Sequence, residues 1–198
     1  FYRYAMARGA DFIATAHYRT GPKDQSYFLW AVPKGVLGKT LFPLAGYMKE
    51  QVRTLARRFD LPVAQKPDSQ GICFLGNVSV KDFLKSEIGD SPALLYTIGE
   101  RVEGGYVVDK DIITGQVEIA STPRGAQTIH FSQANWLADH EGPLTAQYRY
   151  HGPRIPGNVR RTVSHIFEPD TPLREQPAPG QSIVFYNQDR LVGGGIID

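Results

Sequence analysis

Apolar residues at the start of the chain recur at helical spacing and then form a short continuous run. Residues 1–8 place apolar side chains three and four positions apart, and Gly9 suits the left-handed residue that ends a helix. The apolar run from Asp11 to Thr15 follows and is typical of a buried strand. A helix, a glycine and a strand in this order predict half of a parallel α/β unit.

A second helical pattern begins at Met48 and ends at the turn residues Leu61 to Val63. Its apolar positions share one face: Val52, Leu55, Ala56 and Phe59. A polar loop rich in turn-forming residues covers 65–71, and a shorter helical pattern covers 80–85. Residues 87–105 are rich in glycine and charge, which indicates a connection or a small adaptor.

After residue 106 the pattern changes to short runs of β-branched and aromatic residues between Pro and Gly turns. The runs are Gly115–Ala120, Thr128–Phe131, Leu144–Tyr150, Val159–Phe167, Ser182–Tyr186 and Arg190–Ile197. Their even spacing and a closing hairpin across 187–189 favour a small antiparallel β-barrel, which leaves no open edge. The glycines 193–195 are interpreted as close backbone packing within the last strand. The predicted fold class is therefore α/β plus β.

Composition and charge add little to this picture except at the N-terminal end. The hydrophobic share of 41% supplies a core, and the formal net charge is +2. Residues 1–60 nevertheless carry ten Lys and Arg against four Asp and Glu. This local excess fits a polyanionic partner such as RNA, although a solvated surface gives the same imbalance.

The single cysteine excludes an intrachain disulfide, and the chain has no Cys/His cluster at metal-ligand spacing. We therefore expect no bound metal site. No run approaches the roughly 18 apolar residues of a membrane span, and no signal-like block opens the chain. These features predict a soluble, cytoplasmic protein without a membrane partner. Because the first residue is Phe1, an incomplete chain is one interpretation.

Cys73 has two interpretations. It stands between Ile72 and Phe74, and free cysteine often serves as a small buried hydrophobe. The polar, glycine-containing loop before it instead favours a reactive thiol, because such a loop can move the sulfur between a donor and an acceptor.

Polar residues after the first predicted strand form a second candidate group. His17 would lie at the carboxyl edge of the sheet, where α/β proteins bind ligands. Lys23, Asp24 and Gln25 precede the apolar Phe28 to Trp30. Asp24 can cap a helix there, or the three polar residues can contact RNA phosphate and base edges.

The segment from Gln147 to His151 alternates aromatic and polar residues. As a strand, it would present Tyr148 and Tyr150 on one face and Arg149 on the other. Tyrosines beside an arginine are typical of RNA-binding surfaces, and an amphipathic strand half in the core fits the same pattern. Positive charge from Arg154, Arg160 and Arg161 favours RNA.

Several segments keep the order seen in one enzyme family, and together they cover nearly the whole chain. They are Gly9–Tyr18, Lys23–Leu29, Leu41–Leu44, Asp68–Gly76, Tyr96–Gly99 and Pro179–Ser182. The two most specific are Asp-Ser-Gln-Gly-Ile-Cys-Phe and Lys-Asp-Gln-Ser-Tyr-Phe. With these motifs the chain resembles the tRNA-specific 2-thiouridylase family. The resemblance implies part of a Rossmann-like ATP-pyrophosphatase domain (1–76), a small central domain (77–108) and a tRNA-binding β-barrel (109–198).

The resemblance also implies a reaction, in which ATP with Mg²⁺ adenylates the C2 oxygen of the wobble uridine of tRNA. A cysteine persulfide, loaded by a donor protein, then delivers sulfur to that carbon. Cys73 corresponds to the sulfur carrier. Ala16 stands where the family has a glycine next to ATP. The implied tRNA contacts are His17, Lys23, Asp24, Gln25, Arg149, Tyr150 and Gln181.

The chain also departs from the family. The family's phosphate-binding loop and its other catalytic cysteine have no counterpart here, and several connections are short, among them the one between Tyr18 and Lys23. Two alternatives to the complete enzyme follow. The chain could be a non-catalytic module that binds tRNA, or a stand-alone relay in which Cys73 passes persulfide sulfur to another protein.

Overall fold

The computed structural model describes residues 1–21, 24–66, 80–161 and 164–198. The chain divides into two compact units. The first unit comprises residues 1–65, 128–171 and 179–198, and the second unit comprises residues 66–127 and 172–178. No helix in the described ranges is both long and apolar enough to cross a membrane.

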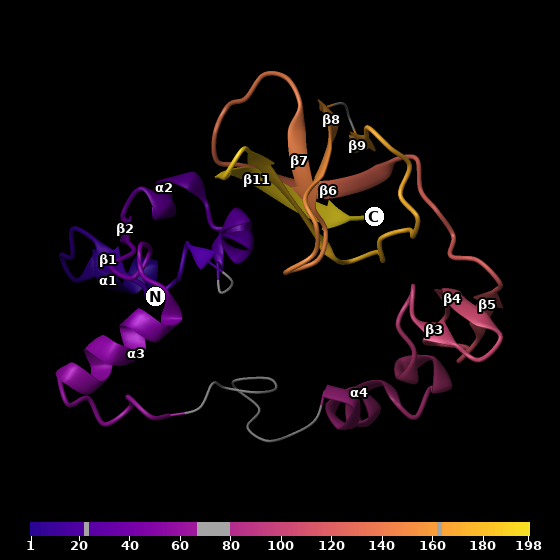
Figure 1. The fold of residues 1–198 in the computed structure, drawn as a ribbon, viewed down its shortest axis with the longest axis horizontal. Coiled ribbons are helices and arrows are strands. Elements are labelled where there is room, and N and C mark those ends of the chain that lie inside the picture. The colour runs from indigo at the N-terminus through magenta and orange to yellow at the C-terminus, as the bar shows by residue number, and fades with distance from the viewer. Residues whose placement is uncertain (22–23, 67–79, 162–163) are drawn as a thin grey trace. The chain divides into compact units, whose positions relative to one another are not determined.

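The N-terminal part of the first unit is a fragment of a parallel α/β fold (Figure 1). Helix α1 (Tyr2–Ala7) ends before Gly9, whose φ of +82° is the left-handed conformation that the sequence predicts. Strand β1 (Ile13–Ala14) pairs in parallel with β2 (Thr40–Leu41). The parallel unit is therefore confirmed, with a first strand shorter than predicted. The helices after β1 are η2 (Ser26–Ala31), α2 (Lys34–Leu37) and α3 (Lys49–Arg58).

The rest of the first unit is a closed antiparallel barrel in the order β10-β11-β6-β9-β8-β7. Its strands are β6 (Ile129–Trp136), β7 (Leu144–Gln147), β8 (Ile155–Arg161), β9 (His165–Pro169), β10 (Ser182–Asn187) and β11 (Arg190–Ile197). Phe131, Phe167 and Phe185 are fully buried, with ring centroids 5.1 and 5.8 Å from Phe185 to the other two. The predicted barrel and its closing hairpin between β10 and β11 are confirmed.

Helix η2 packs against the barrel and joins the two parts of the first unit. Tyr27, Leu29 and Trp30 form one buried cluster with Val184, Tyr186 and Leu191 of the last two strands. The amide nitrogen of Asn135 on β6 donates to the carbonyl of Val32, 3.0 Å away. The segment that follows the predicted RNA contacts is thereby fixed to the barrel.

Gly194 on β11 makes this packing possible. A Cβ atom added there would lie 2.8 Å from the indole ring of Trp30 and 2.7 Å from the carbonyl oxygen of Ile183. Both distances are shorter than carbon tolerates, so only glycine fits beneath Trp30 without a shift. This contact confirms the interpretation of the glycines 193–195 as close backbone packing.

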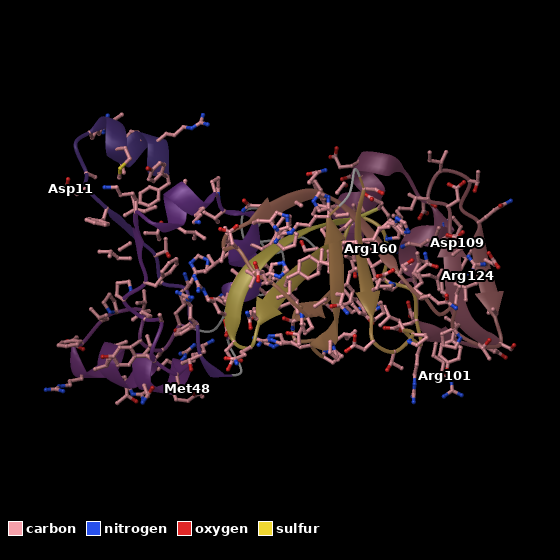
Figure 2. All side chains as sticks on the ribbon, turned by 90° about the horizontal axis from the view of Figure 1, so that it is seen from above. Asp11, Met48, Arg101, Asp109, Arg124 and Arg160 are labelled. Carbon is pink, nitrogen blue, oxygen red and sulfur yellow. The ribbon has the colours of Figure 1, made fainter. Side chains whose placement is uncertain are left out.

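The second unit contains α4 (Val80–Ile88), η3 (Pro92–Leu95) and a three-stranded antiparallel sheet of β3 (Arg101–Val102), β4 (Gly105–Lys110) and β5 (Val117–Ala120). The expectation that Gly115–Ala120 belongs to the barrel is wrong for β5, which pairs with β4. Alternating apolar residues indicate a strand without identifying its partner, because any sheet offers the same ladder. Figure 2 shows Arg101, Asp109 and Arg124 in this unit.

Candidate functional site

His17 follows β1 closely, as the sequence predicts. Its Nδ1 atom lies 3.0 Å from the hydroxyl of Thr15, and its ring meets Phe42 edge-on with centroids 6.1 Å apart. The ring is half-buried, whereas the neighbouring Ala16 is exposed. The structure thus gives His17 a fixed orientation beside the open end of a short parallel sheet, and the roles of both residues remain predictions.

Asp24 and Gln25 organise the chain just before η2. The carboxylate of Asp24 accepts the Ser26 N–H at 2.7 Å, while the Gln25 side chain accepts the Tyr18 N–H at 3.2 Å. The backbone N–H of Gln25 donates to the carbonyl of Tyr18 at 2.8 Å. The structural interpretation of this motif therefore holds in part, because Asp24 bonds near the helix start. Lys23 lies outside the described residues.

The segment after β7 is a turn, so the prediction of strand alternation through Tyr150 is wrong. Strand β7 ends at Gln147, whose side-chain amide donates to the carbonyl of Gly152 at 2.9 Å. Gly152 N–H in turn donates to the carbonyl of Arg149 at 2.8 Å, and His151 adopts a φ of +64°. These local bonds compete with the β-ladder and end the strand.

The turn brings Tyr150 against η2. Its ring centroid lies 5.8 Å from that of Tyr27 and 4.6 Å from that of Phe28. The adjacent ring of His151 is 3.8 Å from Tyr150. Two predicted RNA-contact segments, distant in the sequence, therefore meet at one place in the first unit.

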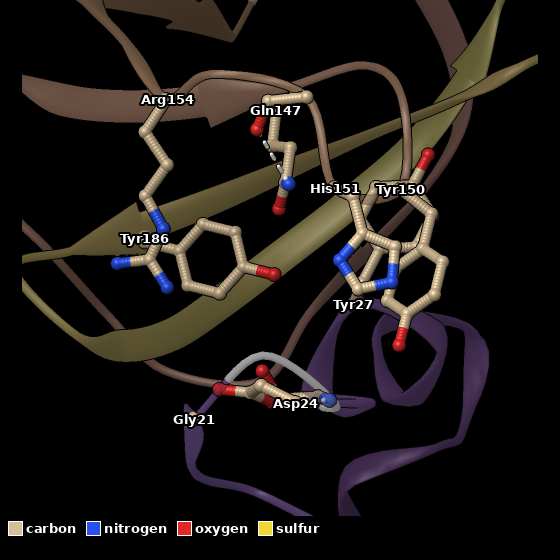
Figure 3. A pocket seen from close by; sticks show the side chains of 10 residues that line it. Gly21, Asp24, Tyr27, Gln147, Tyr150, His151, Arg154 and Tyr186 are labelled. Carbon is tan, nitrogen blue, oxygen red and sulfur yellow. Dashed lines mark hydrogen bonds between the residues drawn. The ribbon is translucent and has the colours of Figure 1, made fainter.

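A pocket of about 160 Å³ lies at this meeting point (Figure 3). Its lining is polar and aromatic: Gly21, Asp24, Ser26, Tyr27, Gln147, Tyr150, His151, Gly152, Arg154 and Tyr186. Of the predicted tRNA contacts it includes Asp24 and Tyr150. We call this pocket the tyrosine pocket.

Arg154 contributes the positive charge of the tyrosine pocket. Its guanidinium lies 3.9 Å above the ring of Tyr186, and it donates to the carbonyl of Gln188 at 2.8 Å and the carboxylate of Asp189 at 3.0 Å. These contacts fix the planar group in one orientation while leaving donors for a ligand. The other two arginines expected to add charge lie elsewhere, since Arg160 pairs with Glu168 and Arg161 stacks on Trp136.

Burial raises the pKa of the phenols of the tyrosine pocket. It raises the pKa of Tyr27 to about 12, assisted by the nearby Tyr186. Burial also raises the pKa of Tyr150, with a contribution from the Asp24 carboxylate, and that of Tyr186. Near neutral pH the described lining offers phenol hydroxyls beside the Asp24 carboxylate and the Arg154 guanidinium. Such a set suits a polar, uncharged ring.

The raised pKa of Tyr27 predicts a loss of stability in alkali. The neutral Tyr27 hydroxyl donates to the carbonyl of Ser182 at 2.9 Å, and a buried phenolate cannot make this bond. The stabilisation is complete below the unfolded pKa near 10 and is lost as the pH rises through about 12. Urea unfolding between these values should show a falling free energy, with a smaller slope for Tyr27→Phe. An identical slope in that variant would exclude Tyr27 as the source.

The other predicted residues that the structure describes do not line the tyrosine pocket. The side-chain oxygen of Gln181 is buried and finds no hydrogen-bond partner in the part of the chain that the structure describes. Gln181 directly precedes Ser182, which binds Tyr27, whereas Arg149 neighbours Tyr150 without lining the pocket. Cys73 lies outside the described residues. No group of three or more potential metal ligands occurs within the described ranges.

Sequence reasoning missed several lining residues. Gln147 and His151 belong to the alternating segment, but its pattern does not reveal the turn that directs them into the pocket. The sequence gives no polar signal at Tyr186, because this residue lies within the apolar run that forms β10. In the structure it is 1% exposed. A tyrosine in such a run is a weak hint, since a buried hydroxyl usually needs a partner.

Comparisons with known proteins agree with this architecture. Residues 1–77 match the family model described as the tRNA methyl transferase HUP domain, and residues 126–197 match the aminomethyltransferase beta-barrel domain. The tRNA-specific 2-thiouridylase MnmA of Hahella chejuensis is 35% identical over an alignment of 256 residues, which covers all of this chain and 68% of that protein. The MnmA proteins of Enterococcus faecalis and Streptococcus thermophilus are 32% and 33% identical, each with 67% of its length covered. These alignments are longer than the 198 residues of the chain, so it lacks residues that the relatives carry between matched positions.

Proposed function

Because this chain belongs to the tRNA-specific 2-thiouridylase family, we propose that it acts in the conversion of uridine to 2-thiouridine in tRNA. The reaction replaces an oxygen by sulfur, which makes the protein a tRNA sulfurtransferase. One structural observation supports the RNA part of this proposal. Two polar segments far apart in the sequence, around Asp24 and Tyr150, converge in the tyrosine pocket.

The proposed chemistry takes place at C2 of the wobble uridine. Adenylation of the C2 oxygen by ATP turns a poor leaving group into a good one. The terminal sulfur of a Cys73 persulfide attacks C2, and AMP departs with the oxygen. A second thiol, which the single cysteine of these 198 residues does not supply, then cleaves the remaining sulfur–sulfur bond, which leaves one sulfur on the uridine and a disulfide between the two thiols.

The chain supplies only part of what this reaction needs. Ala16 is exposed after β1, and its single methyl group is the smallest addition to the glycine of the family. The 198 residues contain no glycine-rich loop of the kind that cradles phosphate, so we assign no phosphate contact to them. The contribution that we assign to this chain is the sulfur carrier Cys73 and the grip on tRNA.

We assign the grip on tRNA to the tyrosine pocket and its neighbours. An unpaired nucleobase can stack on Tyr150 or His151, while the Asp24 carboxylate accepts from an amino or imino group of the base. Arg154 and Arg149 supply donors for the phosphates on either side. The proposed partners are thus tRNA and a protein that carries a persulfide, and the proposed location is the cytoplasm, where tRNA and reduced thiols coexist.

Arg149→Ala in the full-length protein is expected to weaken tRNA binding and to reduce its salt dependence. Binding with one phosphate contact fewer releases about one counterion fewer. The negative slope of log K against log salt should therefore become shallower by about 1. Binding is measured by filter retention over a series of salt concentrations, and 2-thiouridine by mass spectrometry of digested tRNA.

The matched control is Arg101→Ala, which removes an exposed arginine from β3 in the second unit. An unchanged salt slope for Arg149→Ala would remove Arg149 from the phosphate contacts. Absence of 2-thiouridine when the full-length wild type receives tRNA, ATP and a persulfide donor would contradict the proposed function itself.

A further inference from the structure

Arg19 is an exposed cation at the end of the parallel strand pair. Its guanidinium lies over the ring of Phe42, 5.5 Å from the centroid. Arg19 follows β1 in the chain and Phe42 directly follows β2, so this contact lies beyond the carboxyl ends of both strands. Open α/β sheets bind their ligands at this edge. Within the described ranges, Arg19 forms no ion pair with a carboxylate.

The ring beneath Arg19 is itself held in place. Phe42 packs against the buried cluster that joins η2 to the barrel, and the half-buried ring of His17 meets it edge-on. An arginine that stacks on an aromatic face keeps the N–H donors at the edge of its guanidinium plane free for other partners. Such a planar fork matches the oxygens of a phosphate group. Arg19 is therefore oriented by its stacking while its donors stay available.

Backbone hydrogen bonds tie the segment of Arg19 to the tyrosine pocket. Tyr18, the residue before it, donates its N–H to the Gln25 side chain at 3.2 Å and accepts the Gln25 N–H at 2.8 Å. Gly21, two residues after Arg19, and Asp24 both line the pocket. Two residues span at most about 7 Å. An RNA strand that places a base in the tyrosine pocket therefore carries its backbone past Arg19.

The chain around Arg19 is electropositive. Residues 12–49 contain five Lys and Arg but a single acidic residue, Asp24. The Asp24 carboxylate accepts the Ser26 N–H at 2.7 Å and lines the tyrosine pocket. An excess of cations with one carboxylate attracts a polyanion, and its phosphates supply most of the binding free energy that depends on salt. The local charge thus favours a phosphate as the ligand of Arg19.

We propose that Arg19 binds a backbone phosphate of tRNA beside the nucleotide whose base enters the tyrosine pocket. This inference rests on the proposed function, because it takes tRNA as the ligand. A single guanidinium suits the one charge of a phosphodiester. The triphosphate of ATP carries several charges and is usually held by a glycine-rich loop, which these 198 residues do not contain.

The test measures tRNA binding by the full-length protein over a series of salt concentrations. Arg19→Ala is expected to lower the affinity about tenfold and to make the negative slope of log K against log salt shallower by about 1. Arg19→Lys should keep the slope of the wild type, because an ammonium group still displaces a counterion. The matched control is Arg8→Ala, since Arg8 also lies over an aromatic ring, 4.0 Å from the centroid of Tyr4, but precedes β1. Its affinity and slope should stay at wild-type values.

An unchanged slope for Arg19→Ala would overturn the phosphate contact. An equal change in Arg8→Ala would overturn it as well, since the effect would then follow net charge alone. Titration calorimetry with a non-hydrolysable ATP analogue tests the other source of phosphate, and weaker analogue binding with an unchanged tRNA slope would assign Arg19 to the nucleotide instead. If the wild type binds tRNA but forms no 2-thiouridine, the proposed function fails, while a shallower slope for Arg19→Ala still supports its phosphate contact.

Discussion

Replacing Cys73 by serine in the full-length protein is expected to abolish 2-thiouridine formation while leaving the affinity for tRNA nearly unchanged. A hydroxyl group cannot carry persulfide sulfur, and it is not ionised near neutral pH, whereas a thiol reaches its thiolate easily. Cys73 is the single cysteine of these 198 residues. The change removes one sulfur atom from a side chain to which we assign no tRNA contact.

The measurement separates loading from transfer. After incubation with a persulfide donor, mass spectrometry of the proteolytic peptide that contains residue 73 should detect an added sulfur atom in the wild type and none in Cys73→Ser. Arg101→Ala serves as a control that keeps the thiol. Full thiolation by Cys73→Ser would contradict its role as the sulfur carrier, and loss of tRNA binding in the same variant would show that the residue also shapes the RNA surface.

The spacing of apolar residues along the chain predicts the architecture, because it reflects which positions are buried. The helix that ends at Gly9, the parallel strand after it and the barrel strands β10 and β11 all follow from local patterns. The pattern does not identify strand partners, so it predicts a barrel strand at β5, which pairs with β4 instead. It also joined β8 and β9 into one run, since an antiparallel pair and a single long strand contain the same residue types.

The candidate site was predictable only in part. Asp24 and Tyr150 carry side chains that are unusual enough to be noticed in sequence, and they do meet. Their geometry depends on hydrogen bonds that no periodicity encodes, such as the one from Gln147 to the carbonyl of Gly152. The sequence does not indicate that Tyr186 lines the pocket, because this residue lies in an apolar strand of the core. Site chemistry could thus be inferred from residue types, whereas the turn that assembles it could not.

The joint between η2 and the barrel makes the tRNA grip depend on core packing. Trp30 is 6% exposed and lies over Gly194, where a single added carbon would collide with its ring. The same helix carries Tyr27, which binds Ser182 and faces Tyr150. The position of Asp24 relative to Tyr150 is therefore set by a tryptophan that touches no RNA in the proposed complex.

Trp30→Ala is accordingly expected to destabilise the first unit by about 3–5 kcal/mol, because truncating a buried tryptophan loses its burial and leaves a cavity. Urea unfolding followed by the fluorescence of Trp136, which stacks on Phe185 in the barrel, measures this change. Val63→Ala, at a position 60% exposed, should stay within about 0.5 kcal/mol of the wild type. We also expect weaker tRNA binding by Trp30→Ala under conditions where it remains folded, since η2 no longer fixes Asp24 opposite Tyr150. Equal stability of the two variants would show that the barrel does not depend on η2, and the tyrosine pocket would then lack the rigid wall on which the proposed tRNA grip rests.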